Sequence, residues 1–431
     1  MTGSMKVQIN AGYDKHLSFE NRSIKYDELI THIIIFSLIS ASLISSAAAF
    51  IFLLSGLFHC VKRYQYSLAA CKECWPLFSF SIVAIMSTLW SETPASSLKW
   101  ALQIFCTTLI CVSLIYTVKK EVIITALTVS LVTLMLYGLS SNNTVIISYT
   151  GEVVRIGHFG SKNNMSSFAA FSAMVGISTL CIPTMRPHMK ALGGFCTLLS
   201  IVVFYYAKSL GTNLAFFTVL AIALAIFFYS TRNISIINRR IINPLIVGYF
   251  ILFILSVIYF FNFSYYEDLM YSLGKDPTIT GRTMIWEIGF DSIKDNPFLG
   301  VGYGAYWNID NPGAIEIWEL MHKEIGALFG FHNLYIHYYV ELGILGFLSI
   351  VSIVGSCIKQ AYLRATHGME LFDIFIFILF LFFFAKSFVE TTGFAQFHFS
   401  HFNLCLIWMT LNRKTFFDCG KKTIVVFEGK A

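Results

Sequence analysis

The chain has 431 residues, of which 56% are hydrophobic and only 13% are charged, and its mean hydropathy is +0.69. A soluble domain usually carries about 25% charged residues, so this composition excludes a soluble globular protein and makes lipid the solvent of most of the chain. The net charge of +6 does not indicate nucleic-acid binding, because Lys and Arg lie in short clusters between apolar runs, as the cytoplasmic anchors of membrane helices do.

The start of the chain determines how many spans we predict. Residues 1–29 are polar and mixed in charge, and we expect a cytoplasmic tail without a cleavable signal peptide. The next apolar run, 30–59, is long for one membrane helix and short for two. As a tight two-span hairpin it gives about twelve spans with both termini inside, which we favour. As one span it gives eleven, with the N-terminus outside.

Further apolar segments that can span a membrane recur along nearly the whole chain. They are residues 76–90, 100–118, 122–139, 164–183, 191–207, 214–230, 244–263, 334–357, 371–388 and 398–411. Positively charged clusters alternate consistently with these spans. We therefore predict an all-α polytopic inner-membrane protein with about twelve transmembrane helices. Its predicted parts are a cytoplasmic N-terminal tail (1–29), N-terminal membrane helices (30–261), a large periplasmic loop (262–333), C-terminal membrane helices (334–411) and a cytoplasmic C-terminal tail (412–431).

The predicted loop 262–333 is far longer than an ordinary connection, and connections of that length usually have a function. It carries charge of both signs, amphipathic segments and turn signals such as Asn296-Pro297. We expect it to fold as a small, mostly helical cap on the outer side of the membrane.

Two polar stretches on the predicted outer side precede that loop. Arg155, His158, Lys162 and Asn163 lie close together before a span begins, and a helix N-terminus can bind phosphate. An ordinary basic loop that touches lipid head groups explains the same pattern equally well. Lys208 lies in a short break between two spans. It either takes part in an anion site or extends toward the interface, which is the commoner fate of such a lysine.

Arg282 stands in the first turn of a predicted helix within the loop. A cation there opposes the helix dipole, so helix stability does not explain it. A planar, permanently charged guanidinium suits bidentate binding of phosphate. The spacing of Gly300, Gly302 and Gly304 is like that of dinucleotide-binding loops, but no strand precedes it, and we reject that function.

The end of the loop leads into a span with four candidate residues. His332 and Asn333 lie at the predicted membrane boundary, where an imidazole can act as a base near neutral pH. His337 and Glu341 are four residues apart, so they share one helix face and can pair just inside the membrane. A carboxyl group at that depth must be satisfied, so Glu341 is structural or functional and not incidental.

Two groups of possible metal ligands are present, and we expect neither to hold a metal. Cys71 and Cys74 form a lone Cys-x-x-Cys pair, whereas a structural zinc site normally needs four ligands. His398, His401 and Cys405 lie close to one face of the last predicted span. Hydrogen bonding between helices is the commoner role for such residues.

Several short motifs occur in a fixed order along the chain. They are Phe-Gly-Ser-Lys-Asn-Asn at 159–164, Gly281-Arg282 with Trp286, Asn-Pro-Phe-Leu-Gly-Val-Gly at 296–302, His332-Asn333, and Glu-Leu-Gly-Ile-Leu-Gly at 341–346. Together with the predicted topology, this order resembles the O-antigen ligase and bacterial polysaccharide polymerase family, which includes the Wzy-type polymerases. The first motif is similar to an element of the exopolysaccharide polymerases.

The resemblance implies glycosyl transfer without a metal or another cofactor. The implied donor is an undecaprenyl-pyrophosphate-linked oligosaccharide, and the acceptor is a sugar hydroxyl outside the membrane. By the resemblance, Arg282 holds the departing pyrophosphate and His332 activates the acceptor. Many relatives carry an arginine in the short loop 208–213, which this chain lacks. Lys208 is the nearest cation there, and Arg155 and Lys162 would supply the remainder.

Three functions are compatible with these features. We expect a polymerase that joins repeat units into O-antigen, capsule or exopolysaccharide. The alternatives are a ligase that attaches finished glycan to lipid A core and a transporter of a lipid-linked sugar. A transporter favours repeated halves or broken helices that converge at the midplane, whereas the polar residues here gather at the outer rim. For a polymerase, the resemblance also implies a flippase and a chain-length regulator as partners.

Overall fold

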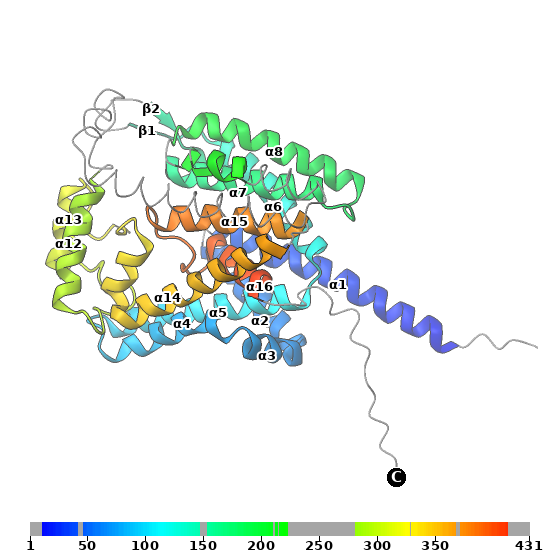
Figure 1. Cartoon of the computed structure of the whole chain (residues 1–431), viewed down its shortest axis with the longest axis horizontal. Coiled ribbons are helices and arrows are strands. Elements are labelled where there is room, and N and C mark those ends of the chain that lie inside the picture. Colours follow the sequence, from blue (N-terminus) through cyan, green and yellow to red (C-terminus); the bar gives the residue numbers. More distant parts are fainter. Residues whose placement is uncertain are drawn as a thin grey trace, which may run out of the picture.

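The protein is described here by a computed structural model that covers residues 11–41, 46–146, 153–209, 212–213, 215–222, 281–327, 329–367 and 371–412. Residues 223–280 and both chain ends therefore lie outside the described residues, including the predicted span 244–263, part of the predicted span 214–230 and the start of the predicted loop. The described part is mostly helical, and its long helices lie side by side in one bundle (Figure 1).

Apolar helices build this bundle. They are α1 (Ala11–Ala41), α2 (Ser46–Lys62), α3 (Tyr64–Glu73), α4 (Trp75–Met86), α5 (Pro94–Thr117), α6 (Lys120–Ser140), α7 (Lys162–Cys181), α8 (Pro187–Ala207), α14 (Leu334–His367), α15 (Leu371–Ser387) and α16 (Phe399–Asn412). Proline lies in the first turn of α4, α5 and α8, where its missing N–H is no loss. Phenylalanines such as Phe168, Phe380 and Phe402 fill the core between the helices.

Five of the described helices are long and apolar enough to cross a membrane, namely α5, α6, α7, α8 and α14. The pair α2 and α3 passes the same test together but is bent by 98°. The prediction of an all-α polytopic membrane protein is therefore confirmed, whereas the number twelve stays a prediction. Residues 30–59 are divided between α1 and α2, which pack against each other, as a two-helix interpretation requires.

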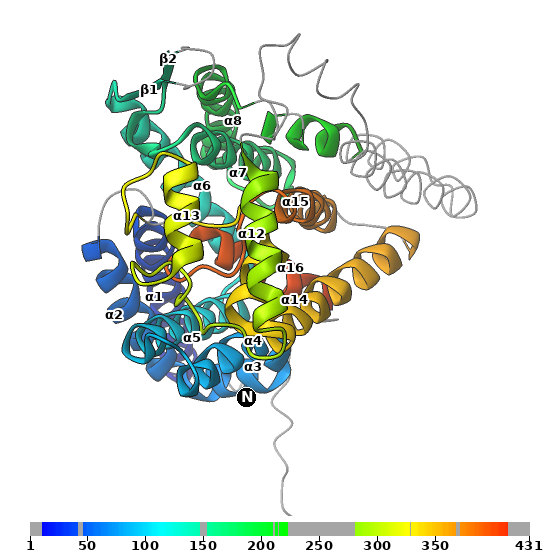
Figure 2. The same ribbon diagram turned by 90° about the vertical axis from the view of Figure 1, so that its left-hand side faces the viewer.

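Two short helices lie across one end of the bundle, which we call the cap end. They are α12 (Arg282–Asp295) and α13 (Pro312–Leu320), and the view from this end shows both in front of the bundle (Figure 2). A separate apolar core holds them together, including the fully buried Trp318 and Phe331. The indole of Trp286 donates a hydrogen bond to the backbone oxygen of Phe331 over 2.7 Å. The described part of the predicted loop is thus a helical cap.

A short hairpin that the sequence did not predict lies beside the cap end. Its strands are β1 (Thr144–Ile146) and β2 (Val153–Arg155), which pair antiparallel with Thr144 opposite Arg155. The 3-10 turn η2 (Gly157–Phe159) follows and leads into α7. Ser161 caps α7, because its hydroxyl accepts the backbone N–H of Asn164 over 3.1 Å.

The glycine-rich run 296–304 joins the cap to α14 by direct backbone contact. The N–H of Gly302 donates to the oxygen of Glu341 over 2.8 Å, and the N–H of Ile344 donates to the oxygen of Pro297 over 3.0 Å. At this point Gly343 interrupts α14 with φ 61° and ψ −157°, a conformation that is essentially confined to glycine. A Cβ atom on Gly300 would lie 2.5 Å from the carbonyl carbon of Glu341. These glycines therefore allow two backbones to meet.

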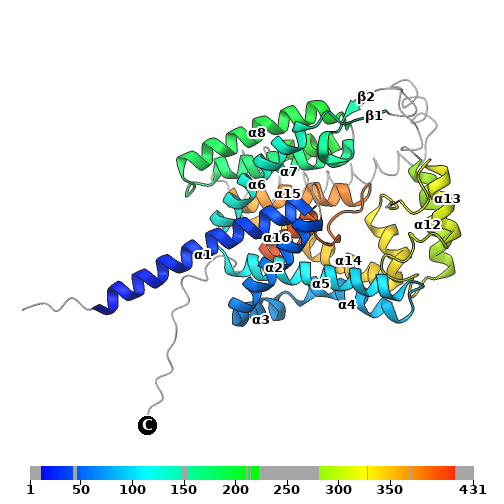
Figure 3. The ribbon, with the colours of Figure 1, turned by 180° about the vertical axis from the view of Figure 1, so that it is seen from behind.

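The helix directions separate the connections into two groups. The connections before α5, between α6 and α7, after α8, and between α15 and α16 all fall at the cap end. The lysine pair Lys119 and Lys120 and the pair Arg186 and Lys190 lie in connections at the opposite end. Seen from behind, α1 extends beyond that opposite end (Figure 3). This arrangement is the one that alternating charge clusters predicted, although no membrane side is established by it.

Candidate active site

One carboxylate at the cap end gathers side chains from three distant parts of the chain. Glu390 lies in the connection between α15 and α16, and its Oε1 accepts hydrogen bonds from Nη2 of Arg282 (2.9 Å) and Nδ2 of Asn163 (3.0 Å). Its Oε2 lies 3.0 Å from Nδ1 of His332. The structure thus brings together both predicted catalytic residues and one predicted phosphate-binding residue.

The cap positions Arg282 and His332 relative to each other. Arg282 is the first residue of α12 and is 9% exposed, and it follows Gly281, whose φ of 79° turns the chain into the helix. Trp286, one helical turn later, binds the backbone of Phe331, the residue before His332. His332 itself has a left-handed backbone with φ 51°. Such strain in a non-glycine residue is typical of functional positions.

The first turn of α7 forms another side of the site. Asn163 donates to Glu390 through its amide nitrogen, while its amide oxygen accepts the hydroxyl of Ser209 over 2.9 Å. Ser166, in the same turn, donates a 2.5 Å hydrogen bond to Oδ1 of Asn213. The short polar break after α8 is thereby tied to the start of α7, as the polar character of both stretches suggested.

The electrostatics assign a proton to one nitrogen of His332. Burial alone would raise the pKa of Glu390, but the hydrogen bond with His332 and the charges of Lys386 and Arg282 lower it to about 2. Glu390 is therefore ionised near neutral pH, and an ionised carboxylate only accepts hydrogen bonds. Nδ1 of His332 must then carry the proton, which leaves the lone pair of Nε2 for accepting a proton from another group.

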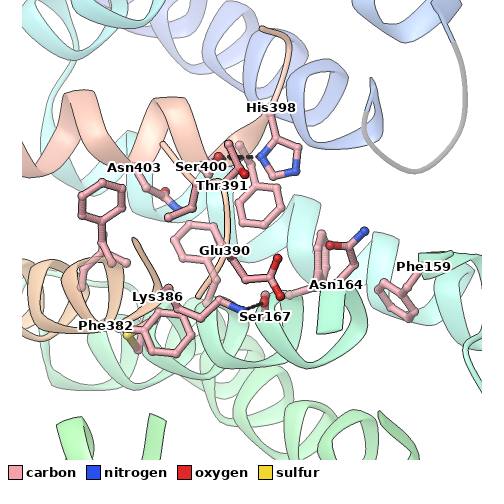
Figure 4. A pocket seen from close by; sticks show the side chains of 17 residues that line it. Phe159, Asn164, Ser167, Phe382, Lys386, Glu390, Thr391, His398, Ser400 and Asn403 are labelled. Carbon is pink, nitrogen blue, oxygen red and sulfur yellow. Dashed lines mark hydrogen bonds between the residues drawn. The ribbon is translucent and has the colours of Figure 1, made fainter. Parts of the chain in front are cut away.

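A lysine lies on the membrane side of the carboxylate. Lys386 precedes Glu390 by four residues and is 6% exposed, and its Nζ donates to the hydroxyls of Ser167 (2.9 Å) and Thr212 (3.2 Å). A cavity of about 140 Å³ opens beside it between α7, α15 and α16. Figure 4 shows Lys386, Ser167 and Glu390 together on its wall. The site thus combines two cations, one anion, one histidine and several hydroxyl and amide groups.

The other predicted residues near the membrane boundary have structural contacts. Asn333 caps α14, because its Oδ1 accepts the N–H groups of Tyr335 and Ile336, and its Nδ2 donates to the backbone of Phe388. Nε2 of His337 lies 3.5 Å from Oε1 of Glu341, so the predicted pair is present. Nδ1 of His337 is buried and has no hydrogen-bond partner among the described residues.

Arg155 and His158 contact other groups of the cap end. The guanidinium of Arg155 donates to the backbone oxygens of Leu139 and Ser141 at the end of α6. His158 stacks on Tyr137 with ring centroids 4.4 Å apart. Lys162 begins α7, and Lys208 ends α8 in a left-handed conformation. Pyrophosphate binding by Arg155, Lys162 and Lys208 stays a prediction, and the donors of Arg155 are directed at a helix end.

Sequence reasoning missed Glu390 and Lys386. A signal was available, because Lys386 ends a run of apolar residues and ionisable residues within membrane segments are rare and often functional. The four-residue spacing to Glu390 also places both near one helix face. What the sequence could not show is that Glu390 meets Arg282, 108 residues earlier in the chain.

Metal ligation has no support among the described residues, where no group of three His, Cys, Asp or Glu side chains could hold an ion. His401 instead hydrogen-bonds to Thr108 of α5 over 2.9 Å and to the backbone oxygen of Gly393 over 2.7 Å. These are the contacts between helices that the sequence favoured for this residue.

Two comparisons with known proteins agree with the motif order. A family model described as "O-Antigen ligase" matches residues 195–351. The chain is also similar to the exopolysaccharide production protein ExoQ of Rhizobium meliloti (strain 1021), with 23% identity over 354 residues, which covers 81% of this chain and 77% of that protein. Both findings agree with the resemblance to the O-antigen ligase and polymerase family.

Proposed function

We propose that this protein polymerises undecaprenyl-pyrophosphate-linked oligosaccharide repeat units into a polysaccharide at the periplasmic face of the bacterial inner membrane. The observation that carries this proposal is the carboxylate of Glu390, which holds Arg282 and His332 on its two oxygens at the cap end. The name of the relative, an exopolysaccharide production protein, favours a polymer of the exopolysaccharide kind over other products.

The reaction needs one base and one anion-binding group, and the site offers both. A hydroxyl of the acceptor sugar attacks the anomeric carbon of the donor, so a new C–O bond forms while the bond to the pyrophosphate oxygen breaks. The hydroxyl proton passes to Nε2 of His332, the nitrogen that the contact with Glu390 leaves available. Negative charge builds on the departing pyrophosphate, where the guanidinium of Arg282 stabilises it without reorganising.

Glu390 has a positioning role in this scheme. It keeps the ring of His332 in one tautomer and orientation, and it favours the imidazolium that forms when the proton arrives. It also holds the guanidinium of Arg282 through the 2.9 Å hydrogen bond from Nη2, and a phosphate would bind the remaining N–H groups. Because Arg282 is a permanent cation, the proposed transfer needs no metal ion for charge neutralisation.

A deletion strain tests the proposed function. Loss of all long chains, with glycan of a single repeat unit remaining, supports a polymerase. Lipid-linked polymer that accumulates without reaching lipid A would instead identify a ligase, the function that the description of the family model names. Loss of polymer together with lipid-linked repeat units trapped on the cytoplasmic side would identify a transporter.

Plasmid complementation of that strain tests the site. We expect Arg282→Ala and His332→Ala each to abolish long chains at native protein levels. The matched controls are Lys294→Ala and His322→Ala, which change an exposed residue of the same type in the cap. If both site variants made native amounts of polymer, the catalytic assignment would be wrong. A flippase and a chain-length regulator are the partners we propose, to be sought by co-purification.

A further inference from the structure

A buried lysine in the membrane bundle requires an explanation that packing does not supply. Lys386 lies in the last turn of α15, which is otherwise almost wholly apolar, and only 6% of it is exposed. Ionisable side chains in membrane segments are unfavourable and commonly belong to substrate pathways. The nitrogen of Lys386 is directed at Ser167 of α7 and Thr212, which follows α8.

The contacts of Lys386 leave the site with an excess of positive charge. Both of its hydrogen-bond acceptors are neutral hydroxyls, and the single carboxylate of the site is engaged by Arg282 and His332. Arg282 and Lys386 thus contribute two positive charges against one negative charge from Glu390. A lysine whose task was only to neutralise Glu390 would bind that carboxylate directly. The arrangement instead suits an additional anion.

The cavity beside Lys386 has the shape and the lining for such an anion on an apolar chain. Its lining combines polar side chains, among them Lys386, Glu390 and Ser167, with several phenylalanine rings such as Phe159 and Phe382 (Figure 4). Asn403 also lines it, and the buried oxygen of this amide finds no hydrogen-bond partner among the described residues. A charged group beside aromatic side chains matches an amphipathic ligand.

We propose that Lys386 binds the phosphate of the donor that carries the polyprenyl chain, while Arg282 binds the phosphate that carries the sugar. This inference rests on the proposed function. The order follows from position, because Arg282 belongs to the cap beside the base His332, whereas Lys386 lies one turn deeper in α15. The first isoprene unit then enters the phenylalanine-lined part of the cavity, and the sugar stays at the cap end.

The two hydroxyls give Lys386 a resting arrangement without substrate. An ammonium group has three donors, and Ser167 and Thr212 accept two of them. A phosphate oxygen that enters the cavity takes the third donor or replaces one hydroxyl, so no large movement of α15 is needed. The phosphate also gains from the low dielectric of the surrounding phenylalanines, in which a charge-assisted hydrogen bond is stronger than in water.

The test measures binding of undecaprenyl diphosphate to the full-length protein in lipid nanodiscs. In Lys386→Gln we expect its affinity to fall about ten- to a hundredfold, the range for one lost hydrogen bond between charged groups. Binding of undecaprenyl monophosphate should fall by a similar factor, because that lipid carries the phosphate assigned to Lys386. Inorganic pyrophosphate, which lacks the chain, should bind weakly to the native protein and the variant alike.

A matched control and a second variant separate binding from folding. Lys359→Gln removes an exposed lysine from α14 and should leave the affinity unchanged. Ser167→Asp keeps Lys386 but places a carboxylate against its nitrogen, which adds an ion pair in place of an unpaired charge. We expect this variant to lose affinity for both lipids by at least about tenfold, even if Lys386→Gln fails to fold.

The outcomes distinguish this inference from the proposed function. If the native protein forms polymer and Lys386→Gln and Ser167→Asp bind both lipids as tightly as it does, the role of Lys386 is overturned and the function stands. If the native protein binds neither lipid and its deletion leaves polymer intact, the proposed function fails as well. In a polymerisation assay, Lys386→Gln should raise the KM of the lipid-linked donor far more than it lowers kcat.

Discussion

Ion pairs lie at both ends of the helix bundle, and they differ in how each carboxylate is used. At the end opposite the cap, Nη2 of Arg63 contacts both oxygens of Asp27 at 2.9 and 3.1 Å, and Arg364 pairs with Asp373 at 2.7 Å. Asp27 and Asp373 each pair with an arginine, and each pair joins neighbouring helices. At the cap end, Glu390 instead receives Arg282, His332 and Asn163 beside a cavity.

This difference separates pairs that hold helices together from a group that can act on a substrate. The group around Glu390 keeps a net positive charge, an imidazole nitrogen and an adjoining cavity. If the comparison is right, substitutions around Glu390 should reduce activity, whereas substitutions at the opposite end should reduce stability alone.

The largest effect is expected for Glu390→Gln, which preserves the shape of the side chain but removes its charge. His332 then loses the group that fixes its tautomer, and Arg282 loses its partner. We expect the rate of polymerisation to fall about 10²- to 10³-fold, the usual range for such groups. Gel analysis of chain length in the complemented deletion strain measures this. Asp373→Asn at the opposite end is the control, and equal losses in the two variants would contradict the comparison.

The pH dependence of stability gives a second contrast. The pKa of Glu390 is lowered from about 4.5 to about 2, so its ionised form stabilises the folded protein by about 3 kcal/mol above pH ~4.5. This contribution is lost as the pH falls from about 4.5 toward 2, because the unfolded chain takes up the proton first. Unfolding of the native protein and of Glu390→Gln can be measured between pH 7 and 3. The difference between their unfolding free energies should be constant down to about pH 4.5 and should shrink at lower pH.

A stability difference that stayed constant down to pH 3 would show that the pKa of Glu390 is not depressed. The same depression means that Glu390 does not titrate between pH 5 and 8. A change of polymerisation rate in that range is therefore not caused by titration of Glu390.

A smaller effect is expected where the cap joins the bundle. Gly343→Ala places a side chain in a conformation that only glycine adopts readily, and its Cβ would meet the backbone of Phe298. We expect a loss of about 2–3 kcal/mol in unfolding free energy, measured by thermal or chemical denaturation. Gly355→Ala, in the same helix with no described atom within 4 Å, is the control. It should change stability by about 1 kcal/mol or less.

The smallest effect is expected at the opposite end. Arg364→Gln removes the pair with Asp373, whose side chains are 27% and 21% exposed. A partly exposed pair of this kind is worth about 1 kcal/mol, so unfolding free energy should fall by about that amount. Polymer length and rate should equal those of the native protein. A loss of activity without a loss of stability would mean that this pair also takes part in the reaction.

Arg282 and His332 could be singled out from the sequence because the signals that mark them are local. An arginine in the first turn of a helix lacks a structural reason there, and a histidine before a span is placed near the interface. Their meeting point could not be predicted, because it depends on Glu390 and on the contact between Trp286 and Phe331, which join distant segments. The hydrophobic pattern also predicts one uninterrupted span over 334–357, whereas the helix is interrupted at Gly343.

Arg155 illustrates a different limit. Its position beside His158 and Lys162 indicated either an anion site or an ordinary basic loop, and in the structure its guanidinium binds backbone oxygens at the end of α6. Carbonyl groups at a helix end lack partners within the helix and attract cations. The hairpin of β1 and β2 directs Arg155 there, and that hairpin has too few residues to be recognised in the sequence.

The contact between residues 296–304 and α14 also limits how such a chain can diversify. Two backbones touch there with no side chain between them, so an inserted or deleted residue would shift every later contact of the cap. Residues 322–326 are exposed and follow α13, so additional residues can be accommodated there without moving Arg282 or His332. Length changes are therefore expected after α13, while the glycine-rich run keeps a constant length.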